Sequence, residues 1–422
     1  MLKVAPLGKR VLRTVFTRVL GHRKGRISTV NTKNDVIYLD SNASTPCDPR
    51  VVEAMLPYFG GVFANPSSRN HGPGRDAFTA LEGARATVAR CLGARSATEI
   101  VFTSGASEGN NLALIGAATA LAGRGRHLVT QATEHPSVLE PLRWLAASGW
   151  DVSVVGVDGD GRVRLDELDS VLRDDTALIS LMLANNETGT IQPFREAAEL
   201  AHRQGALIHC DAAQGAGKIA FDVDALGADL MTISGHKVYG PKGIGALYLR
   251  RRTPPLKLPP IIHGGGHENG LRSGTPNVAG AVGLARALEI AEDGLGEEAA
   301  RIAQFRDRLE MRIVNAVESC TVNGSRGSRL PGTSNLAFAG IEGNALLASL
   351  PDLAVSTGSA CASNHPDASP VLRAMGVSKK LASASIRVSL GRFTTGDEID
   401  RAAQRLIDEV GRLRTLSRRP RR

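Results

Sequence analysis

A lysine flanked by glycines, Lys237, lies in the segment ISGHKVYGPKGIG (233–245), directly after an apolar run. Lysine is a poor nucleophile while it is protonated, but desolvation or nearby cations lower its pKa enough for it to form a Schiff base. Ser234 and His236, beside it, are suited to hold an anion. A lysine in a glycine-rich segment is also compatible with an ordinary surface turn, so other segments must decide between the two interpretations.

An acidic residue, Asp211, ends the apolar run ALIHCD (206–211). A carboxylate at this position either caps a helix or pairs with a buried cation. Pyridoxal 5'-phosphate requires such a partner, because a carboxylate keeps its pyridine nitrogen protonated and lets the ring accept electrons. Gln214, three residues further on, has an amide that can donate to the phenolic oxygen of the ring. Together with Lys237, these residues favour a pyridoxal-phosphate site.

The segment SGASEGNN (104–111) has the composition of a phosphate-binding helix start. Gly105 lets the backbone approach a ligand closely, and the free amides at Ala106 and Ser107 face a helix dipole that favours an anion. A plain helix N-terminus with Ser107 and Glu108 in its first turn explains the same residues, and the two interpretations are compatible.

Three further side chains suit a flat, charged ligand. His135, in TEHPS, precedes a proline that fits a first helical turn, so it either caps that helix or stacks on an aromatic cofactor and moves protons. Asn186, in NNETG, can hydrogen-bond the ring oxygen or a substrate carboxylate. Arg387, in SIRVSLG, ends an apolar run and carries a planar fork that matches an amino-acid carboxylate.

Cys361 lies in VSTGSACAS (355–363), a run of small and mostly polar residues. Such a run predicts neither a core strand nor a regular helix, and it suits a segment that moves. Taken alone, the thiol is most simply an incidental buried cysteine. A cofactor site elsewhere in the chain would give it a different meaning, that of a nucleophile.

Short β-branched runs that alternate with helix-like segments must position these side chains. The alternation predicts an α/β fold with a mainly parallel, doubly wound sheet, in which ligands bind beyond the carboxyl ends of the strands. The polar segments SGASEG, TEHPS, NNETG, DAAQ and SGHK each follow such a run, so we expect them at one edge of the sheet. The expected strands are EIVFT (99–103), HLVTQ (127–131), TALISLML (176–183), ALIHCD (206–211), DLMTIS (229–234) and GALYLR (245–250).

The predicted elements follow a different order in the later part of the chain. We expect a long helix over 278–318, followed by the strands LAFAG, LAVST and SIRVSL separated by helices, which together predict a second, α+β domain. The length of 422 residues also favours two domains.

The composition excludes several classes of protein. The sequence has no apolar run long enough to span a bilayer, and its five cysteines form no CxxC or His/Cys cluster. These features argue against a membrane protein, a metal site and a disulfide framework, and they favour a reducing compartment.

The net charge of +9 comes from the amino terminus, since residues 1–33 hold nine Lys and Arg and no acid, which leaves 42 basic and 42 acidic residues elsewhere. The body of the chain is therefore not expected to bind nucleic acid directly. The amphipathic, arginine-rich pattern near the amino terminus resembles an organelle transit peptide, whereas a disordered extension is the alternative that we favour.

From Tyr38 to about Leu416 the chain resembles the Nif/Isc-type cysteine desulfurases of the class V aminotransferase family. The resemblance rests on ten segments in order: YLDSNASTP, NPSSRNHGPG, VFTSGASEGNN, TEHPSVLEP, NNETGTIQP, DAAQGAGK, SGHKVYGPKGIGALY, GGGHENGLRSGTPN, STGSACAS and SIRVSLGRFT. It implies the fold of type I pyridoxal-phosphate-dependent transferases, which is aspartate-aminotransferase-like. The implied parts are a basic extension (1–34), a large cofactor-binding domain (48–294), and a small domain made of 35–47 and 295–422.

The resemblance also implies a role for each candidate side chain. Lys237 would hold the cofactor as a Schiff base, His135 would stack on the ring as acid and base, and Cys361 would be the nucleophile. Asp211 would pair with the pyridine nitrogen, and Arg387 would bind the substrate carboxylate. The remaining contacts would come from Ala106, Ser107, Asn186, Gln214, Ser234, His236 and, from the other subunit of a homodimer, Thr275, with Asn186 also reaching the substrate.

These roles describe a reaction that converts L-cysteine into L-alanine and leaves a persulfide on Cys361. The sulfur would pass to an acceptor protein, a scaffold or thiolation enzyme, for iron–sulfur cluster assembly or nucleic-acid thio-modification. The alternatives are a selenocysteine lyase, an aminotransferase, against which the SGSAC setting of Cys361 argues, and a catalytically silent binding subunit.

Two departures from the family pattern concern the acceptor. AsnHisPro (364–366) follows Cys361 closely, and the chain ends at RRPRR without the tail with which housekeeping members dock the scaffold. We therefore leave the acceptor open and expect a cytoplasmic enzyme, or an organellar one if residues 1–30 are a transit peptide.

Overall fold

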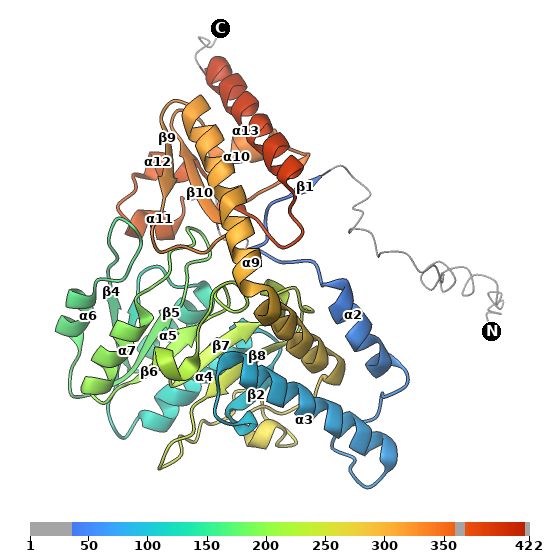
Figure 1. Cartoon of the computed structure of the whole chain (residues 1–422). Helices are drawn as coiled ribbons and strands as arrows, with labels where there is room; N and C mark the ends of the chain where they lie inside the picture. The colour runs from blue at the N-terminus through green and yellow to red at the C-terminus, as the bar shows by residue number, and fades with distance from the viewer. Residues whose placement is uncertain (1–35, 359–367, 418–422) are drawn as a thin grey trace, which may run out of the picture. The chain divides into compact units, whose positions relative to one another are not determined.

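A seven-stranded sheet forms the centre of the computed structural model, which describes residues 36–358 and 368–417 (Figure 1). The strand order is β2-β8-β7-β6-β5-β3-β4. Strand β8 is antiparallel to both of its neighbours, and the other pairs are parallel, so the predicted mainly parallel sheet is confirmed. The strands are β2 (Ile100–Thr103), β3 (His127–Gln131), β4 (Asp151–Val155), β5 (Thr176–Met182), β6 (Leu207–Asp211), β7 (Leu230–Ser234) and β8 (Gly245–Leu249).

Helices cover both faces of this sheet, because side chains that alternate along each strand point into two separate cores. Leu178 of β5 packs with α4 and α5, whereas Ile179 packs with α3, α7 and α9. The helices are α2 (Pro49–Met55), α3 (Gly72–Leu92), α4 (Ala106–Leu121), α5 (Pro136–Ala147), α6 (Leu165–Val171), α7 (Phe194–Arg203), α8 (Val223–Leu226), α9 (Val278–Ala316), α10 (Gly343–Ala348), α11 (Pro370–Ala374), α12 (Lys379–Ser383) and α13 (Gly396–Ser417).

A second, smaller group of strands lies beyond the large sheet. Strands β9 (Cys320–Asn323), β10 (Thr333–Phe338) and β12 (Ser385–Ser389) form an antiparallel sheet in the order β12-β10-β9. Strands β1 (Ile37–Tyr38) and β11 (Leu353–Ala354) form a parallel pair. Of the expected strand LAVST (353–357), only Leu353 and Ala354 belong to β11, and Ser356 forms an isolated bridge with Arg387.

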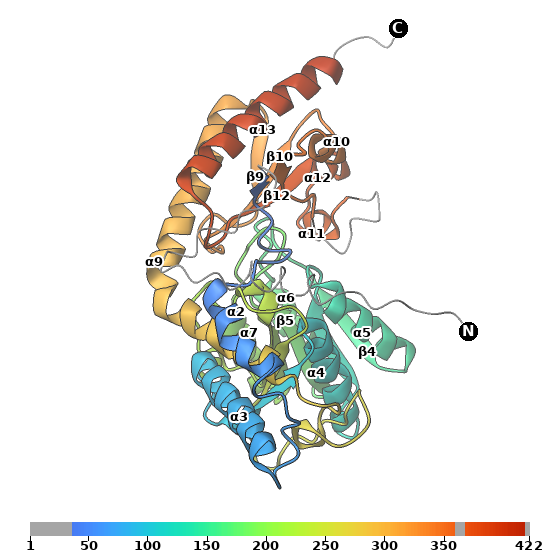
Figure 2. The same ribbon diagram turned by 90° about the vertical axis from the view of Figure 1, so that its right-hand side faces the viewer.

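The long helix α9 connects the two groups of strands (Figures 1 and 2). Its first half packs against α3 and contributes Leu284 and Leu288 to a core of the large sheet. Its second half packs against α13 and contributes Leu309 and Ile313 to a core shared with β10 and β12. The large sheet has a core on each face and the second group of strands has its own, but the described residues form one compact unit, so the division into two domains at residues 47/48 and 294/295 stays a prediction.

The predicted strands of the large sheet match the observed ones to within one residue at each end. Strand β4 was not predicted, because it is an edge strand with largely exposed side chains and lacks a continuous apolar run. Strand β9 was missed for a similar reason, since only one of its four residues is buried. Among the described residues, no helix is long and apolar enough to cross a membrane.

Candidate active site

A pocket of about 500 Å³ opens at the carboxyl ends of β2, β3, β5, β6 and β7. These five strands run in one direction, so the segments that follow them meet at one edge of the sheet, as expected. Each of the five polar segments singled out in the sequence contributes to the pocket wall. The predicted site residues that line it are Ala106, Ser107, His135, Asn186, Asp211, Gln214, Ser234, His236, Lys237 and Arg387.

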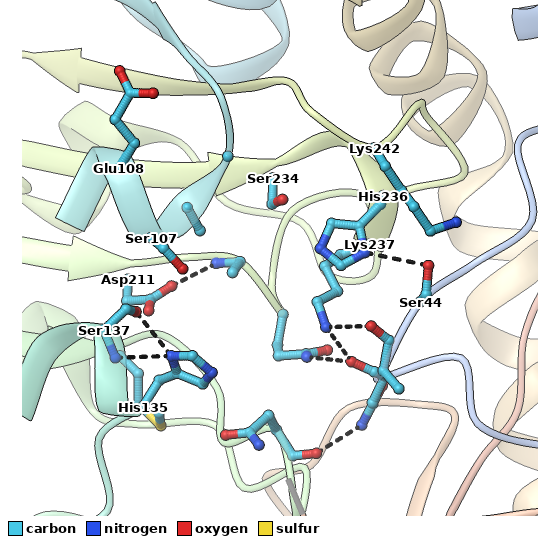
Figure 3. Close-up of a pocket in the computed structure, with 18 of the residues that line it drawn as sticks. Ser44, Ser107, Glu108, His135, Ser137, Asp211, Ser234, His236, Lys237 and Lys242 are labelled. Atoms are coloured by element: carbon cyan, nitrogen blue, oxygen red, sulfur yellow. Dashed lines mark hydrogen bonds between the residues drawn. The ribbon is translucent and has the colours of Figure 1, made fainter. Parts of the chain in front are cut away.

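Lys237 ends a short 3₁₀ turn (Gly235–Lys237) that begins where β7 stops. Its ammonium nitrogen, Nζ, donates to the carbonyl oxygens of Asn42 (2.5 Å) and Ala43 (2.8 Å). Two carbonyl oxygens therefore hold the amine at the pocket wall. Figure 3 shows Lys237 and His236 on one side of the pocket, with Asp211 and His135 on the other.

Asp211 is the last residue of β6 and is only 5% exposed. Its Oδ2 accepts a hydrogen bond from Nδ2 of Asn110 (2.7 Å), and its Oδ1 accepts one from the backbone amide of Ala213 (3.0 Å). These two bonds satisfy one lone pair on each oxygen and fix the plane of the carboxylate. The carboxylate keeps further acceptor capacity for a cationic or N–H group in the pocket.

His135 both caps α5 and faces the pocket, so the two interpretations of this residue hold together. Its Nδ1 accepts a hydrogen bond from the backbone amide of Ser137 (3.1 Å) and lies 2.8 Å from the hydroxyl of Ser137. Pro136 follows at the first helical position, where its missing N–H costs nothing. Burial lowers the pKa of His135, which favours the neutral ring at physiological pH, although the charge of Asp211 opposes this effect.

The start of α4 forms a cradle suited to an anion. Gly105 has φ +152°, a conformation that residues with a Cβ rarely adopt, and a Cβ there would lie 3.7 Å from Oγ of Ser234. The first amides of the 16-residue helix α4 lack intrahelical partners, and the helix dipole favours negative charge there. Burial and the nearby charges of Lys237, Lys242 and Lys218 lower the pKa of His236 to about 4. A neutral imidazole and the amides can therefore donate to a phosphate group.

Arg387 lies in the middle of β12 rather than at its end, and it is 1% exposed. Its Nη2 donates to Oδ1 of Asp40 (2.7 Å), and its Nη1 donates to the carbonyl oxygen of Asn186 (3.0 Å). Its Nε has no hydrogen-bond partner within the described part of the chain. The guanidinium is thus held in place. Because Nε is itself buried, the donors left for a ligand at the pocket wall are the second N–H groups of Nη1 and Nη2.

Sequence reasoning missed several groups that line the pocket or bond to the residues that line it. Asn42 and Ser44 come from the segment after β1, Asn110 from α4, Ser137 from α5, and Lys218 from the segment after β6. The backbone and side chain of Asn42 contact Lys237, Gln214, Lys218 and Thr333. A signal existed for each of them, because all lie in the family-like segments: Asn42 and Ser44 in YLDSNASTP, Asn110 in VFTSGASEGNN, Ser137 in TEHPSVLEP and Lys218 in DAAQGAGK.

Two predicted site residues are not among the described residues that line the pocket. Cys361 lies outside the described residues, although the residues that flank its segment are bonded next to the pocket. Ser356 exchanges backbone hydrogen bonds with Arg387, and the hydroxyl of Ser369 donates to Oε2 of Glu187 (2.5 Å). Thr275 is exposed and does not belong to the described residues that line the pocket of its own chain.

The residues present fit pyridoxal 5'-phosphate. The pocket brings together a lysine amine, a buried carboxylate that can accept from a pyridinium N–H, and a helix start suited to a phosphate. Gly105 leaves this cradle open, because a side chain at that position would project toward Ser234. Among the described residues, no cluster of His, Cys, Asp and Glu side chains has the makings of a metal site.

Comparison with known proteins agrees with this geometry. The profile of the family described as "Aminotransferase class-V" matches residues 37–402. "Cysteine desulfurase IscS" of Anaeromyxobacter sp. (strain Fw109-5) is 48% identical over 381 residues, which cover 90% of this chain and 94% of that protein.

Two solved structures are also similar. One titled "NIFS-LIKE PROTEIN" superimposes with a TM-score of 0.84 at 38% identity, covering 90% of this chain and 100% of that chain. Another, titled "SspA in complex with cysteine", has a TM-score of 0.75 at 37% identity and covers 85% and 99% of the two chains.

Proposed function

This chain belongs to the class V aminotransferase family, whose members depend on pyridoxal phosphate, and on that premise we propose that it is a cysteine desulfurase. It takes sulfur from L-cysteine, releases L-alanine, and holds the sulfur as a persulfide on Cys361. The observation that carries the proposal is the pocket that joins Lys237, Asp211 and Arg387 at one edge of the sheet. A relative whose structure is titled as a complex with cysteine supports this choice of substrate.

We assign the binding of the cofactor to residues at three points of the pocket. Lys237 attaches it, Asp211 accepts from its ring nitrogen, and the start of α4 at Ala106 and Ser107 holds its phosphate together with Ser234 and His236. Asn186 and Gln214 donate to its phenolic oxygen, and His135 stacks on its ring. When bound, the cofactor supplies an electron sink that stabilises negative charge next to the substrate's α-carbon.

The chain's own residues bind the substrate and move its protons. Arg387 binds the carboxylate of L-cysteine, and the amine of Lys237 takes the α-proton. His135, kept neutral by burial, serves as acid and base on the opposite side of the pocket. The positions of these side chains around the pocket support the assignments.

The transfer of sulfur from the substrate to Cys361 needs no oxidant. The thiolate of Cys361 attacks the sulfur of the substrate, a sulfur–sulfur bond forms, and the carbon–sulfur bond breaks with its electron pair left on carbon. A proton then completes the methyl group of alanine. One cysteine and one enzyme thiol thus give one alanine and one enzyme persulfide.

We also propose that the enzyme is a cytoplasmic homodimer and passes its sulfur to an acceptor protein. An exposed Thr275 that lies away from its own pocket fits a contact with the phosphate of the partner subunit. Sedimentation of the purified chain tests the dimer, which a monomeric mass would contradict.

The activity is tested with the purified chain, pyridoxal phosphate, L-cysteine and a thiol reductant. We expect alanine and sulfide in equal amounts, and Cys361→Ala is expected to keep the yellow bound cofactor but to release no sulfide. Pyruvate formed instead of alanine, or activity with selenocysteine but none with cysteine, would contradict the proposal. Transfer of an amino group to a 2-oxo acid would indicate an aminotransferase.

A further inference from the structure

Lys218 lies beneath the pocket in a position that the proposed reaction does not use. It follows Gln214 by four residues in the segment after β6, and its Nζ donates to Oε1 of Gln214 (2.7 Å) and to Oδ1 of Asn42 (3.0 Å). The side chain is partly buried and borders a small cavity of about 30 Å³. Within the described residues, no carboxylate lies close enough to Lys218 for an ion pair.

An ammonium group in this place lowers the stability of the fold, because no carboxylate of the described residues compensates for its partial burial. Charged side chains away from water are normally paired, and Lys218 instead shares its surroundings with the cations Lys237 and Arg387. On the other side of the small cavity, Glu298 is already bonded to Arg392. Burial and these two cations lower the pKa of Lys218 to about 7. A group perturbed in this way next to a ligand pocket is a candidate for a functional role.

The hydrogen bond from Lys218 determines how the amide of Gln214 is oriented. In its protonated form Lys218 has only donors, so it can bind the oxygen of the amide but not its nitrogen. With Oε1 held by Lys218, Nε2 must point the other way, where it donates to the carbonyl oxygen of Asn42 (2.9 Å). Gln214 is 6% exposed and lines the pocket, so both ends of its amide need a hydrogen-bond partner.

The second hydrogen bond of Lys218 reaches the residue that holds the lysine of the site. The same carbonyl oxygen of Asn42 accepts from Nζ of Lys237 (2.5 Å). The side chain of Asn42 is oriented by Lys218 at Oδ1 and by Thr333 at Nδ2 (2.9 Å). Lys218 is therefore connected to both Gln214 and Lys237 through fixed amide groups.

We propose that Lys218 is a positioning residue, which turns the Nε2 donor of Gln214 toward the pocket and fixes the Asn42 carbonyl that holds Lys237. The inference rests on the proposed function, because its ligand is the phenolic oxygen of a bound pyridoxal phosphate. Without Lys218, the amide of Gln214 is free to present its oxygen to that acidic oxygen and repel it.

The test compares Lys218→Met, which keeps the length of the side chain and removes the donor, with the exposed control Lys257→Met. We expect Lys218→Met to raise the dissociation constant of pyridoxal phosphate on the order of 10-fold, and to shift the visible absorption band of the bound cofactor. Lys257→Met is expected to leave both unchanged. A Lys218→Met protein with the wild-type band and affinity overturns the inference.

A double-mutant cycle shows whether Lys218 acts through Gln214. In the Gln214→Ala background, Lys218→Met is expected to weaken cofactor binding less than about 2-fold further. Equal effects in both backgrounds would mean that Lys218 does not act through Gln214, which overturns the inference. If Lys218→Met does not fold, Lys218→Gln takes its place with the same expected shift, because a glutamine can also accept from Nε2 and so leaves the orientation open.

The outcomes separate this inference from the proposed function. If the wild-type chain binds no pyridoxal phosphate, both fail. If the wild type binds it and makes alanine from cysteine while the cycle is additive, the proposed function stands and the role of Lys218 is wrong.

Discussion

The two ends of the pocket are built differently. The Asp211 end consists of Asp211, His135 and Asn110, all from segments that border the large sheet. The Arg387 end consists of Arg387 from β12, Asp40 from the segment after β1, and the carbonyl of Asn186. The first end is organised locally by one sheet edge, whereas the second joins residues as far apart in the sequence as Asp40 and Arg387.

We expect the two ends to have different roles, one in the chemical step and the other in substrate binding. The Asp211 end faces the cofactor's ring and should determine the rate of the chemical step. The Arg387 end carries the fixed guanidinium and should determine how well the substrate's carboxylate binds. Substitutions at the two ends are therefore expected to separate kcat from KM.

The largest effect is expected from Asp211→Ala. Without a carboxylate, the ring nitrogen of the cofactor loses its proton at neutral pH and the ring becomes a poorer electron sink, so kcat should fall by about 10³-fold. Steady-state production of alanine measures the effect, with the exposed Asp169→Ala as the control. A fall of less than about 10-fold would show that Asp211 does not serve the chemistry.

A buried histidine near the Asp211 end, His209, predicts that the stability of the fold depends on pH. His209, two residues before Asp211, is fully buried between the hydroxyls of Ser180 and Thr232, and burial lowers its pKa to about 4. The folded protein therefore favours the neutral ring, and this stability is complete above the unfolded-state pKa and lost as the pH falls toward 4. The free energy of unfolding should lose about 3 kcal/mol from this group between pH 6.5 and 4.

Urea unfolding of the chain at a series of pH values measures this loss. His209→Gln is expected to flatten the profile over that interval, while the exposed control His263→Gln is not. Parallel profiles for the wild type and His209→Gln would contradict the assignment.

At the Arg387 end we expect an effect on substrate binding. Arg387→Lys keeps the charge but cannot hold Asp40, the carbonyl of Asn186 and a carboxylate in one plane, so the KM for L-cysteine should rise about 10- to 100-fold. The change in kcat should stay within about 3-fold. If Arg387→Lys left KM unchanged and reduced kcat, the two ends would not differ in their roles in binding and catalysis.

The smallest effect is expected where Asn42 links the two groups of strands. Thr333→Val removes the hydroxyl that accepts from Nδ2 of Asn42 at 2.9 Å, and both residues are buried. The free energy of unfolding should fall by about 1 kcal/mol, with Thr119→Val on the surface of α4 as the control. An unchanged stability would mean that the carbonyl of Asn186, 3.2 Å away, suffices for Asn42.

The same contrast explains what could be predicted from the sequence. His135, Asp211 and Lys237 were found because each lies at the end of a long apolar run or within four residues of it, and the ends of parallel strands must meet at one edge. Asp40 and Asn42 follow a short run, VIYL (36–39), outside the large sheet, and Lys218 lies seven residues beyond β6. Their positions depend on contacts between segments far apart in the chain, which hydrophobic periodicity does not encode.

Within the fold, the buried strands were predicted closely because both of their faces are apolar. Strand β4 lies at the edge of the sheet and β1 pairs over only two residues, so neither has enough buried positions to produce a pattern.

The central claim is that sulfur from L-cysteine reaches Cys361. The most direct test is a single turnover with sulfur-labelled L-cysteine and the enzyme loaded with pyridoxal phosphate, followed by peptide mapping under non-reducing conditions. We predict one labelled sulfur per chain, located on Cys361, and one alanine released. Label on Cys47, Cys91, Cys210 or Cys320 instead, or alanine released without any enzyme-bound sulfur, would contradict the account.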